Sequence, residues 1–299
     1  MQFDLSKITA KYKVVSVEPL LKGWSRDKKF ILTSLGGVKY LLRISDLSLL
    51  EKKKKQFELL NKIGDLNLEC SRPIEFGYID DGHIYTLLSW LDGESAEDTI
   101  GSYSDLQAYK MGIEAGLALK NLHKIPFEKP LESWYDRYMI KAERKLKALE
   151  ECEYKIENKD FLVDYYKRNL HLMKDRPLSF CHGDYHLGNM IINNGKIGII
   201  DFDKNNVADF VDDFKPYMWN VFKSEHFESG LIDGYFEGKI PDNFFTLLKF
   251  YTVETSISHV PWAVQFGEAE IQTAYRVLNH FKLWWDDFKL DIPTWYKKA

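Results

Sequence analysis

The chain has 299 residues, of which 45% are hydrophobic and 15% aromatic, so it can bury a large core and has room for two lobes. Its formal net charge of −4 gives no support to a general nucleic-acid-binding protein. The three cysteines are scattered and lack CxxC spacing, which is typical of reduced thiols. We find no leader peptide and no run of 18 apolar residues, so we expect a cytoplasmic protein without a membrane span.

The chain changes character near residue 91. Before that point, short apolar runs predict five strands, at 12–18, 28–33, 38–45, 72–80 and 83–90. One helix is expected at 47–64, and the lysine run within it is most simply a solvated face. Beyond residue 91, amphipathic periodicity predicts mostly helices, at 103–123, 132–153, 159–173 and several places between 211 and 288. We therefore expect an α+β fold in which residues 1–91 and 92–299 form separate lobes, with a hinge near 88–93.

One hairpin interrupts the helical half. It lies between HGDYHLGNM at 182–190 and IIDFD at 199–203, and its Asn194-Gly195 pair is a strong signal for a two-residue turn. In that register residue 193 pairs with 196, 191 with 198 and 189 with 200, so that Asn189 and Asp201 meet at the open end. Asp184 can fold back over the same end.

These side chains predict a particular chemistry. An amide oxygen and one or two carboxylates suit Mg²⁺, and a separate carboxylate can then face a substrate hydroxyl. Phosphoryl transfer needs mainly metal ions on the phosphates and a base that orients the attacking hydroxyl. The sequence around the hairpin therefore favours phosphoryl transfer.

The pattern H-G-D-x-x-x-x-N followed by I-D-F-D resembles the catalytic loop and metal-binding segment of the aminoglycoside phosphotransferase and choline kinase superfamily, whose members are relatives of protein kinases. The resemblance implies a two-lobed protein-kinase-like fold with a nucleotide-binding N-terminal lobe. It implies that Asp184 is the catalytic base and that Asn189 and Asp201 bind Mg²⁺. Asp203 would either touch a second metal ion or end the strand. His182 and Gly183 would shape the loop.

The resemblance also implies nucleotide contacts in the first lobe. Ser25 would approach the phosphates from the loop after the first strand, and backbone groups near Ser89 and Leu91 would bind an adenine or guanine edge. Arg43 stands where the kinase pattern has a phosphate-pairing lysine, and its guanidinium can grip phosphates bidentately.

The kinase pattern also expects a glutamate on the following helix to pair with this cation. Helical spacing groups Gln56 with Leu60 and Ile63 on one inward stripe, so the periodicity indicates the neutral Gln56 as the partner. Glu58 is the alternative if the helix is rotated or starts later.

The last third of the chain is acidic. Residues 205–299 contain 14 acidic and 9 basic side chains, a net charge of −5, which indicates either a solvated acidic surface or a cationic partner. The resemblance places the acceptor site in this lobe. Asp209, Asp213 and Glu254 would then meet a polycationic acceptor, whereas a more apolar acceptor would contact aromatic walls such as Trp262.

We expect Mg²⁺-dependent transfer of the γ-phosphate of ATP or GTP to a hydroxyl of a small molecule. The first interpretation is an aminoglycoside-type phosphotransferase, which would confer antibiotic resistance. The second is a kinase for another metabolite or drug, such as a macrolide, choline or a sugar. The third is a weakly catalytic nucleotide-binding protein, motivated by Arg43 and Gln56. The sequence does not separate the first two, and it leaves the oligomeric state open.

Overall fold

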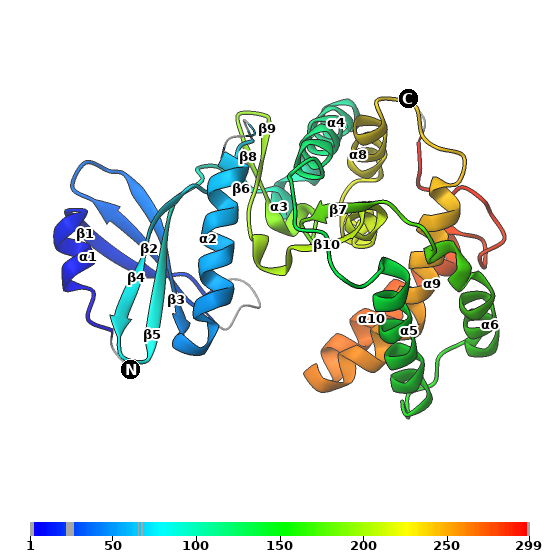
Figure 1. Ribbon diagram of the computed structural model, residues 1–299. Helices are drawn as coiled ribbons and strands as arrows, with labels where there is room; N and C mark the ends of the chain where they lie inside the picture. Colours follow the sequence, from blue (N-terminus) through cyan, green and yellow to red (C-terminus); the bar gives the residue numbers. More distant parts are fainter. Residues whose placement is uncertain (1–2, 22–26, 65, 67, 298–299) are drawn as a thin grey trace. The chain divides into compact units, whose positions relative to one another are not determined.

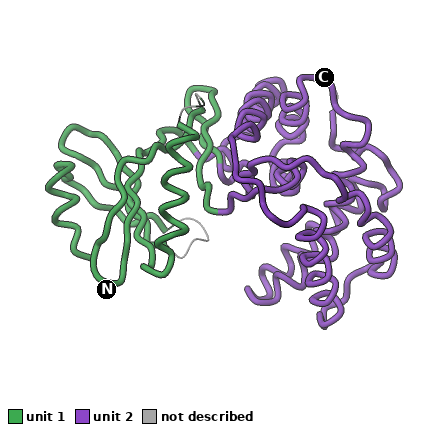
Figure 2. The backbone as a smooth tube through the Cα atoms, in the orientation of Figure 1, with its two compact units in different colours: residues 1–94, 190–203 green, residues 95–189, 204–299 purple. Residues whose placement is uncertain are grey.

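The computed structural model describes residues 3–21, 27–64, 66 and 68–297, and the chain forms two compact units (Figure 2). Unit 1 comprises residues 1–94 and 190–203, and unit 2 comprises residues 95–189 and 204–299. The hairpin after the catalytic motif thus belongs to the same compact unit as the N-terminal residues. That these units are the nucleotide-binding and acceptor-binding lobes, with the boundary near residue 91, stays a prediction.

Unit 1 is built on an antiparallel sheet of five strands in the order β1-β2-β3-β5-β4. The strands are β1 (Val14–Pro19), β2 (Lys28–Ser34), β3 (Lys39–Asp46), β4 (Pro73–Asp80) and β5 (His83–Ser89). They confirm the five strands expected from the apolar runs. The central strands β3 and β5 carry fully buried leucines, Leu42 and Leu87, which pack in one hydrophobic cluster with Ile8 and Leu32.

Two helices accompany this sheet. Helix α2 (Leu50–Gly64) contacts β4 and β5 and follows the short 3₁₀ turn Leu47–Leu49, in agreement with the predicted helix (Figure 1). Helix α1 (Ser6–Lys11) contacts β1 and was not expected from the sequence. It is only six residues long, too short for helical periodicity to be visible.

The predicted hairpin is formed by β8 (Met190–Asn193) and β9 (Lys196–Ile199). Asn193 pairs with Lys196 and Ile191 with Gly198, as the turn signal required. Asn194 and Gly195 have φ angles of 50° and 79°, the left-handed pair that a type I′ turn needs. The ladder ends at the pair Met190 and Ile199, so the predicted pair of residues 189 and 200 is not part of it.

The hairpin is tied to the N-terminal residues by backbone contacts. The N–H of Ile199 donates to the carbonyl oxygen of Glu69 at 2.8 Å. Strand β6 (Glu94–Ser95) completes a three-stranded sheet in the order β6-β8-β9.

Unit 2 is mostly helical. Its helices are α3 (Ala96–Thr99), α4 (Asp105–Leu122), α5 (Trp134–Glu150), α6 (Lys159–Asn169), α7 (Tyr217–Val221), α8 (Glu225–Phe236), α9 (Phe244–Ala263) and α10 (Glu268–Trp284). Shorter 3₁₀ segments cover Ile100–Ser102, Leu170–Met173, Leu187–Asn189, Phe202–Lys204, Phe210–Phe214 and Val264–Phe266. No helix in the described ranges is long and apolar enough to cross a membrane.

Helices α4 and α8 pack against each other at unusually close range (Figure 1). A Cβ atom added at Gly112 or Gly116 of α4 would lie 2.1 Å from a backbone oxygen of α8. Additions at Gly230 and Gly234 of α8 would lie 2.1 and 2.3 Å from backbone oxygens of α4. Only glycine therefore fits at these four positions. Helix α4 also contacts the catalytic loop, because the carbonyl oxygen of Ala115 accepts a hydrogen bond from the Tyr185 hydroxyl at 2.7 Å.

A small antiparallel pair, β7 (Leu178–Cys181) and β10 (Asn206–Asp209), flanks that loop. Strand β7 leads directly into the HGD motif. This pair was not predicted from the sequence. Each strand has only four residues, and the β8–β9 hairpin separates the two strands along the chain.

Candidate active site

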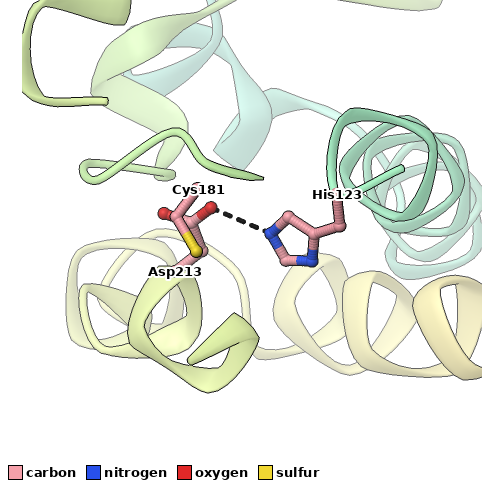
Figure 3. A group of neighbouring side chains, drawn as sticks. All are labelled: His123, Cys181 and Asp213. Atoms are coloured by element: carbon pink, nitrogen blue, oxygen red, sulfur yellow. Dashed lines mark hydrogen bonds and ion pairs between the residues drawn. The ribbon is translucent and has the colours of Figure 1, made fainter. Parts of the chain in front are cut away.

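The catalytic loop is anchored by Asp213. Its carboxylate accepts hydrogen bonds from the backbone N–H groups of His182 and Gly183, at 2.7 and 2.6 Å. His123 Nε2 lies 3.0 Å from the same carboxylate, and Asp213 is only 1% exposed (Figure 3). The first residues of the loop are therefore held by a buried acid that lies about 30 residues further along the chain.

His123, Cys181 and Asp213 form a buried group whose potential ligand atoms lie within 4.8 Å of one another (Figure 3). Both Asp213 oxygens already accept hydrogen bonds, and His123 Nδ1 lies 2.8 Å from the hydroxyl of Tyr235. Burial raises the pKa of the Cys181 thiol, which disfavours the thiolate that a metal would need. The group is thus a support for the loop, and its hydrogen bonds account for its polar atoms.

Two further contacts shape the loop. Gly183 has a φ of 83°, and a Cβ atom there would lie 2.2 Å from the carbonyl oxygen of Lys204, so glycine is required on both counts. At the other end, the N–H of Leu187 donates to Asn220 Oδ1 at 2.7 Å. Asn220 in turn donates to the buried Glu228 at 2.7 Å. Neither Asn220 nor Glu228 belongs to a local motif, so these two residues were not predicted from the sequence.

Asp184 lies on this loop with its side chain partly exposed. Its Oδ2 is 2.9 Å from Lys204 Nζ, and its Oδ1 is 3.6 Å from His186 Nε2. Burial alone would raise the pKa of Asp184, but His186 and Lys204 outweigh burial and lower it below the ordinary value. The carboxylate is therefore ionised at neutral pH, as a proton acceptor must be.

Asn189 is oriented by Asp184. Its Nδ2 donates to the backbone oxygen of Asp184 at 2.9 Å and to its Oδ2 at 3.2 Å. Because the amide nitrogen is turned toward Asp184, the carbonyl oxygen Oδ1 is the atom left to bind a cation. This orientation fits the predicted role of Asn189 as a metal ligand.

The two carboxylates of the IIDFD segment lie in unit 1, beside Arg43. Asp201 Oδ1 is 3.4 Å from Arg43 Nη1, and its side chain is 36% exposed. Asp203 accepts hydrogen bonds from Arg43 and from Gln56 Nε2, and its side chain is 20% exposed. Burial raises the pKa of Asp203, but Arg43 and Lys53 lower it to below its usual value. Asp201 is thus the more accessible carboxylate, whereas Asp203 is occupied by cationic and amide donors.

The described contacts of helix α2 differ from the expected pairing. Gln56 donates a hydrogen bond to Asp203, so its amide contacts the metal-binding segment.

The assignment of the lysine run to a solvated face was wrong for Lys53, which is 6% exposed and lies 2.7 Å from Asp27. Lys53 lies three residues before Gln56, on the same helical stripe as the buried Leu60 and Ile63. The 3-4-3 spacing was therefore the signal that could have identified it.

The other predicted nucleotide contacts divide into three cases. Ser25 lies outside the described residues. The N–H of Ser89 already donates to the carbonyl oxygen of Arg72 at 2.8 Å, which leaves this donor committed to the sheet. Leu91 lines a cleft of about 340 Å³ within unit 1, together with residues of the β8–β9 hairpin such as Ile191 and Gly198. A role for Leu91 in base binding stays a prediction.

The carboxylates expected to meet a cationic acceptor are buried. Asp209 receives two hydrogen bonds from Arg176, at 2.9 and 3.0 Å, and is fully inaccessible. Asp213 holds the catalytic loop, and Glu254 is fully buried next to three lysines. Because they are buried, these three carboxylates do not fit direct contact with an acceptor. The acidic composition of the last third therefore does not indicate a cationic acceptor at these positions, since the acids are paired within the protein. Trp262 is 46% exposed and remains available as an aromatic wall.

Asp213→Asn should loosen the catalytic loop. The new amide would present N–H donors to two backbone N–H groups, so at least one buried donor loses its acceptor, at a cost of about 1–3 kcal/mol. We expect a lower free energy of unfolding by denaturant titration and faster hydrogen exchange at His182 and Gly183. Equal exchange in the variant and the wild type would show that Asp213 does not anchor the loop.

Comparison with known proteins gives the family. The sequence model of the phosphotransferase enzyme family, APH, matches residues 16–243. The chain belongs to this family. No curated protein sequence matches the chain at a significant level. The fold and the family resemblance expected from the sequence are confirmed: the chain is a member of a phosphotransferase family and has a kinase-like fold.

Solved structures of similar fold include antibiotic kinases. The GDP complex of wild-type aminoglycoside 2'-phosphotransferase-IIIa has a TM-score of 0.72 and 16% identity, over 93% of this chain and 96% of that one. The gentamicin complex of APH(2")-IIa has a TM-score of 0.67 and 16% identity, over 93% and 97%. Amicoumacin kinase hAmiN, in complex with AMP-PNP, Ca²⁺ and Ami, has a TM-score of 0.65 and 14% identity, over 97% and 95%. At these identities, the likeness concerns the fold.

Proposed function

We propose that this phosphotransferase transfers the γ-phosphate of ATP or GTP to a hydroxyl of a small molecule in a Mg²⁺-dependent reaction. The observation that carries the proposal is the ionised carboxylate of Asp184 next to Asn189, whose amide oxygen is left for a cation. Asp184 would orient the acceptor hydroxyl and accept its proton. Positioning and charge stabilisation of this kind are the main protein contributions to phosphoryl transfer.

The oxygen donors fit the proposed metal. Mg²⁺ prefers carboxylate and carbonyl oxygens, and each of the two predicted ligands offers such an oxygen within its own unit, Asn189 Oδ1 in unit 2 and the partly exposed Asp201 carboxylate in unit 1. Asp203 is a weaker candidate, since Arg43 and Gln56 already bind its oxygens. When bound, Mg²⁺ would neutralise charge on the phosphate oxygens. Arg43 would contribute a fixed positive charge for the same phosphates.

The nucleotide and the reaction can be tested together. Purified protein would be incubated with Mg²⁺, ATP or GTP, and a panel of hydroxyl compounds, and both the nucleoside diphosphate and the phosphorylated acceptor would be quantified by mass spectrometry. We expect stoichiometric formation of the two products. Nucleotide binding without transfer to any acceptor would favour the weakly catalytic nucleotide-binding alternative.

An aminoglycoside-type antibiotic is the first acceptor candidate. Two of the similar folds support this class. One is the complex of APH(2")-IIa with gentamicin, and the other is aminoglycoside 2'-phosphotransferase-IIIa bound to GDP. The support is at the level of the fold. The acidic residues that first suggested a polycation are buried and paired, so charge no longer favours it.

A lysine cluster favours a second candidate, a neutral or anionic acceptor. The cluster consists of Lys141 and Lys145 of α5 and Lys215, which surround the fully buried Glu254 at 3.5, 2.8 and 3.6 Å. The lysine side chains are 18–27% exposed, so their positive groups cover the buried acid. Burial, together with Lys215 and Lys141, lowers the pKa of Lys145 to about 8 despite Glu254. The three lysines face two acids, Glu254 and Asp212, so the cluster has one more basic than acidic side chain.

The cluster is linked to the catalytic loop by the chain itself. Lys215 pairs with Asp212 at 2.8 Å, and the next residue, Asp213, holds the backbone of His182 and Gly183. Lys215 is therefore carried by the same short segment that anchors the loop, and it shares Glu254 with Lys141 and Lys145 of α5. We propose on this basis that the lysines help to select the acceptor.

Lys141→Gln should separate the two acceptor classes. For an anionic acceptor the KM should rise several-fold, because an attractive charge is lost, and nucleotide KM should change little. For a polycationic aminoglycoside the acceptor KM should fall or stay the same. Initial rates at low and at roughly 0.5 M salt provide the second measurement, since screening weakens only the charge-dependent part of binding.

Lys147→Gln is the matched control, because Lys147 lies on the same helix and is 75% exposed. It should leave both KM values unchanged. We expect anionic or neutral compounds to have a lower KM than gentamicin. Efficient phosphorylation of gentamicin, with a KM that rises with salt, would contradict the second candidate and support the first.

A further inference from the structure

Arg43 is gripped on one edge by a carboxylate that the kinase pattern does not include. Its Nε and Nη2 both donate to Asp27 Oδ2, at 3.0 and 2.8 Å. The two side chains are 9% and 4% exposed. Two hydrogen bonds to one acceptor fix the plane of the guanidinium as well as its position.

Asp27 is itself held firmly. Ser45 Oγ donates to its Oδ1 at 2.8 Å, and Lys53 Nζ donates to its Oδ2 at 2.7 Å. Burial alone would raise the pKa of Asp27, but Arg43 and Lys53 outweigh burial and bring it to about 2. Asp27 is thus a permanent anion between two cations, one on strand β3 and one on helix α2.

The edge of the guanidinium formed by Nη1 and Nη2 faces the metal-binding segment. Arg43 Nη1 lies 3.4 Å from Asp201, and Nη2 also donates to Asp203. Since Asp27 holds the rear edge, the remaining N–H groups are directed at the carboxylates proposed to act with the nucleotide. Removal of Asp27 would let the guanidinium rotate.

We infer that Asp27 is the positioning residue for Arg43 and that Lys53 couples helix α2 to Arg43 through it. The acid that the kinase pattern expects on the helix is supplied instead by Asp27, the residue just before β2, and the helix supplies a cation. Gln56 contributes separately, because it donates a hydrogen bond to Asp203. The inference rests on the proposed function in one respect, namely that Arg43 binds nucleotide phosphates.

Asp27→Asn should impair nucleotide use. The asparagine keeps the size of the side chain and the contact with Ser45 but loses the charge, so Arg43 can shift. A misplacement of about 1 Å in a phosphate-binding group can cost on the order of 10²-fold in rate. We expect kcat/KM for the nucleotide to fall by roughly 10- to 100-fold, and Mg²⁺-nucleotide affinity by calorimetry to fall as well, while acceptor KM stays the same.

A charge-relocating variant provides the rescue. Arg43 and Lys53 bind the same oxygen of Asp27, so position 53 is the place on helix α2 from which an acid would be directed toward Arg43. Asp27→Asn combined with Lys53→Glu should therefore recover much of the lost nucleotide affinity, whereas Lys53→Glu alone should not improve on the wild type. A merely structural role for Asp27 would not be rescued by moving the acid to the helix.

Glu75→Gln serves as the control, since Glu75 is another partly buried acid of unit 1 that pairs with Lys11 at 2.8 Å. It should leave nucleotide affinity unchanged. If the wild type binds no nucleotide, the proposed function fails. If the wild type binds nucleotide and a folded Asp27→Asn variant binds it equally well, the inference about Asp27 fails alone. Loss of folding in Asp27→Asn, with no recovery in the double variant, would also overturn it.

Discussion

Asp184→Asn should reduce kcat by about 10²- to 10⁴-fold, the range expected for loss of a general base. Mg²⁺-nucleotide affinity should change little, because Asn189 and Asp201 are the proposed metal ligands. The substitution preserves the shape of the side chain and leaves the backbone oxygen of Asp184 as an acceptor for Asn189. Single-turnover kinetics and calorimetry would measure the two quantities separately.

The pH profile gives an independent check on this residue. The pKa of Asp184 is lowered, since His186 and Lys204 outweigh burial, so the group loses its charge only below the ordinary value of about 3.9. A general base becomes protonated and inactive as the pH falls through its pKa, so Asp184 should cause no decline in kcat between about pH 5 and 9.

Asp164→Asn is the control for the substitution at Asp184, because Asp164 is an exposed residue of α6 paired with Arg168. Unchanged kcat in Asp184→Asn would remove Asp184 from the mechanism.

Asp201→Asn should weaken binding of the Mg²⁺-nucleotide by at least about tenfold, since even residues that only support metal ligands contribute 10- to 100-fold to affinity. Asparagine is the appropriate substitution, because Asp201 has a φ of 63° and asparagine tolerates this left-handed conformation better than alanine. The loss should be largest in calorimetric titrations at low Mg²⁺ and should shrink as Mg²⁺ is raised. Binding of nucleotide without metal should be nearly unaffected.

Asp203→Asn should behave differently. Asp203 is bound by Arg43 and Gln56, so its loss should disturb the guanidinium rather than the Mg²⁺ dependence. The dependence on Mg²⁺ should therefore distinguish the two variants. Identical Mg²⁺ dependence in Asp201→Asn and the wild type would show that the metal assignment is wrong.

Much of the catalytic loop could be predicted because its information is local. The Asn194-Gly195 turn sets the register of the hairpin through two adjacent positive φ angles. The spacing of Asp184 and Asn189 along one short loop brings the two side chains within hydrogen-bond distance. The alternating apolar runs likewise predicted the strands of the N-terminal sheet.

The supports of that loop could not be predicted, because they are single residues brought in from distant segments. Asp213 and Asn220 lie about 30 residues beyond the loop amides that they bind, and neither belongs to a local motif. Their acidic or polar character is visible in the sequence. Their burial is not, because it depends on how helices α4 and α8 and the β7–β10 pair enclose the loop.

The phosphotransferase class could be inferred from the ordered residues of the HGD and DFD segments and the hairpin between them. The pairing of the charges could not, because it depends on the tertiary fold. Helical periodicity indicated Gln56 as the partner of Arg43, yet the folded chain brings in Asp27 and Lys53. The physical reason is that periodicity reports which face of a helix is buried, whereas a buried charge must be neutralised by whatever opposite charge the fold places within reach. That partner depends on long-range packing, which no local pattern records.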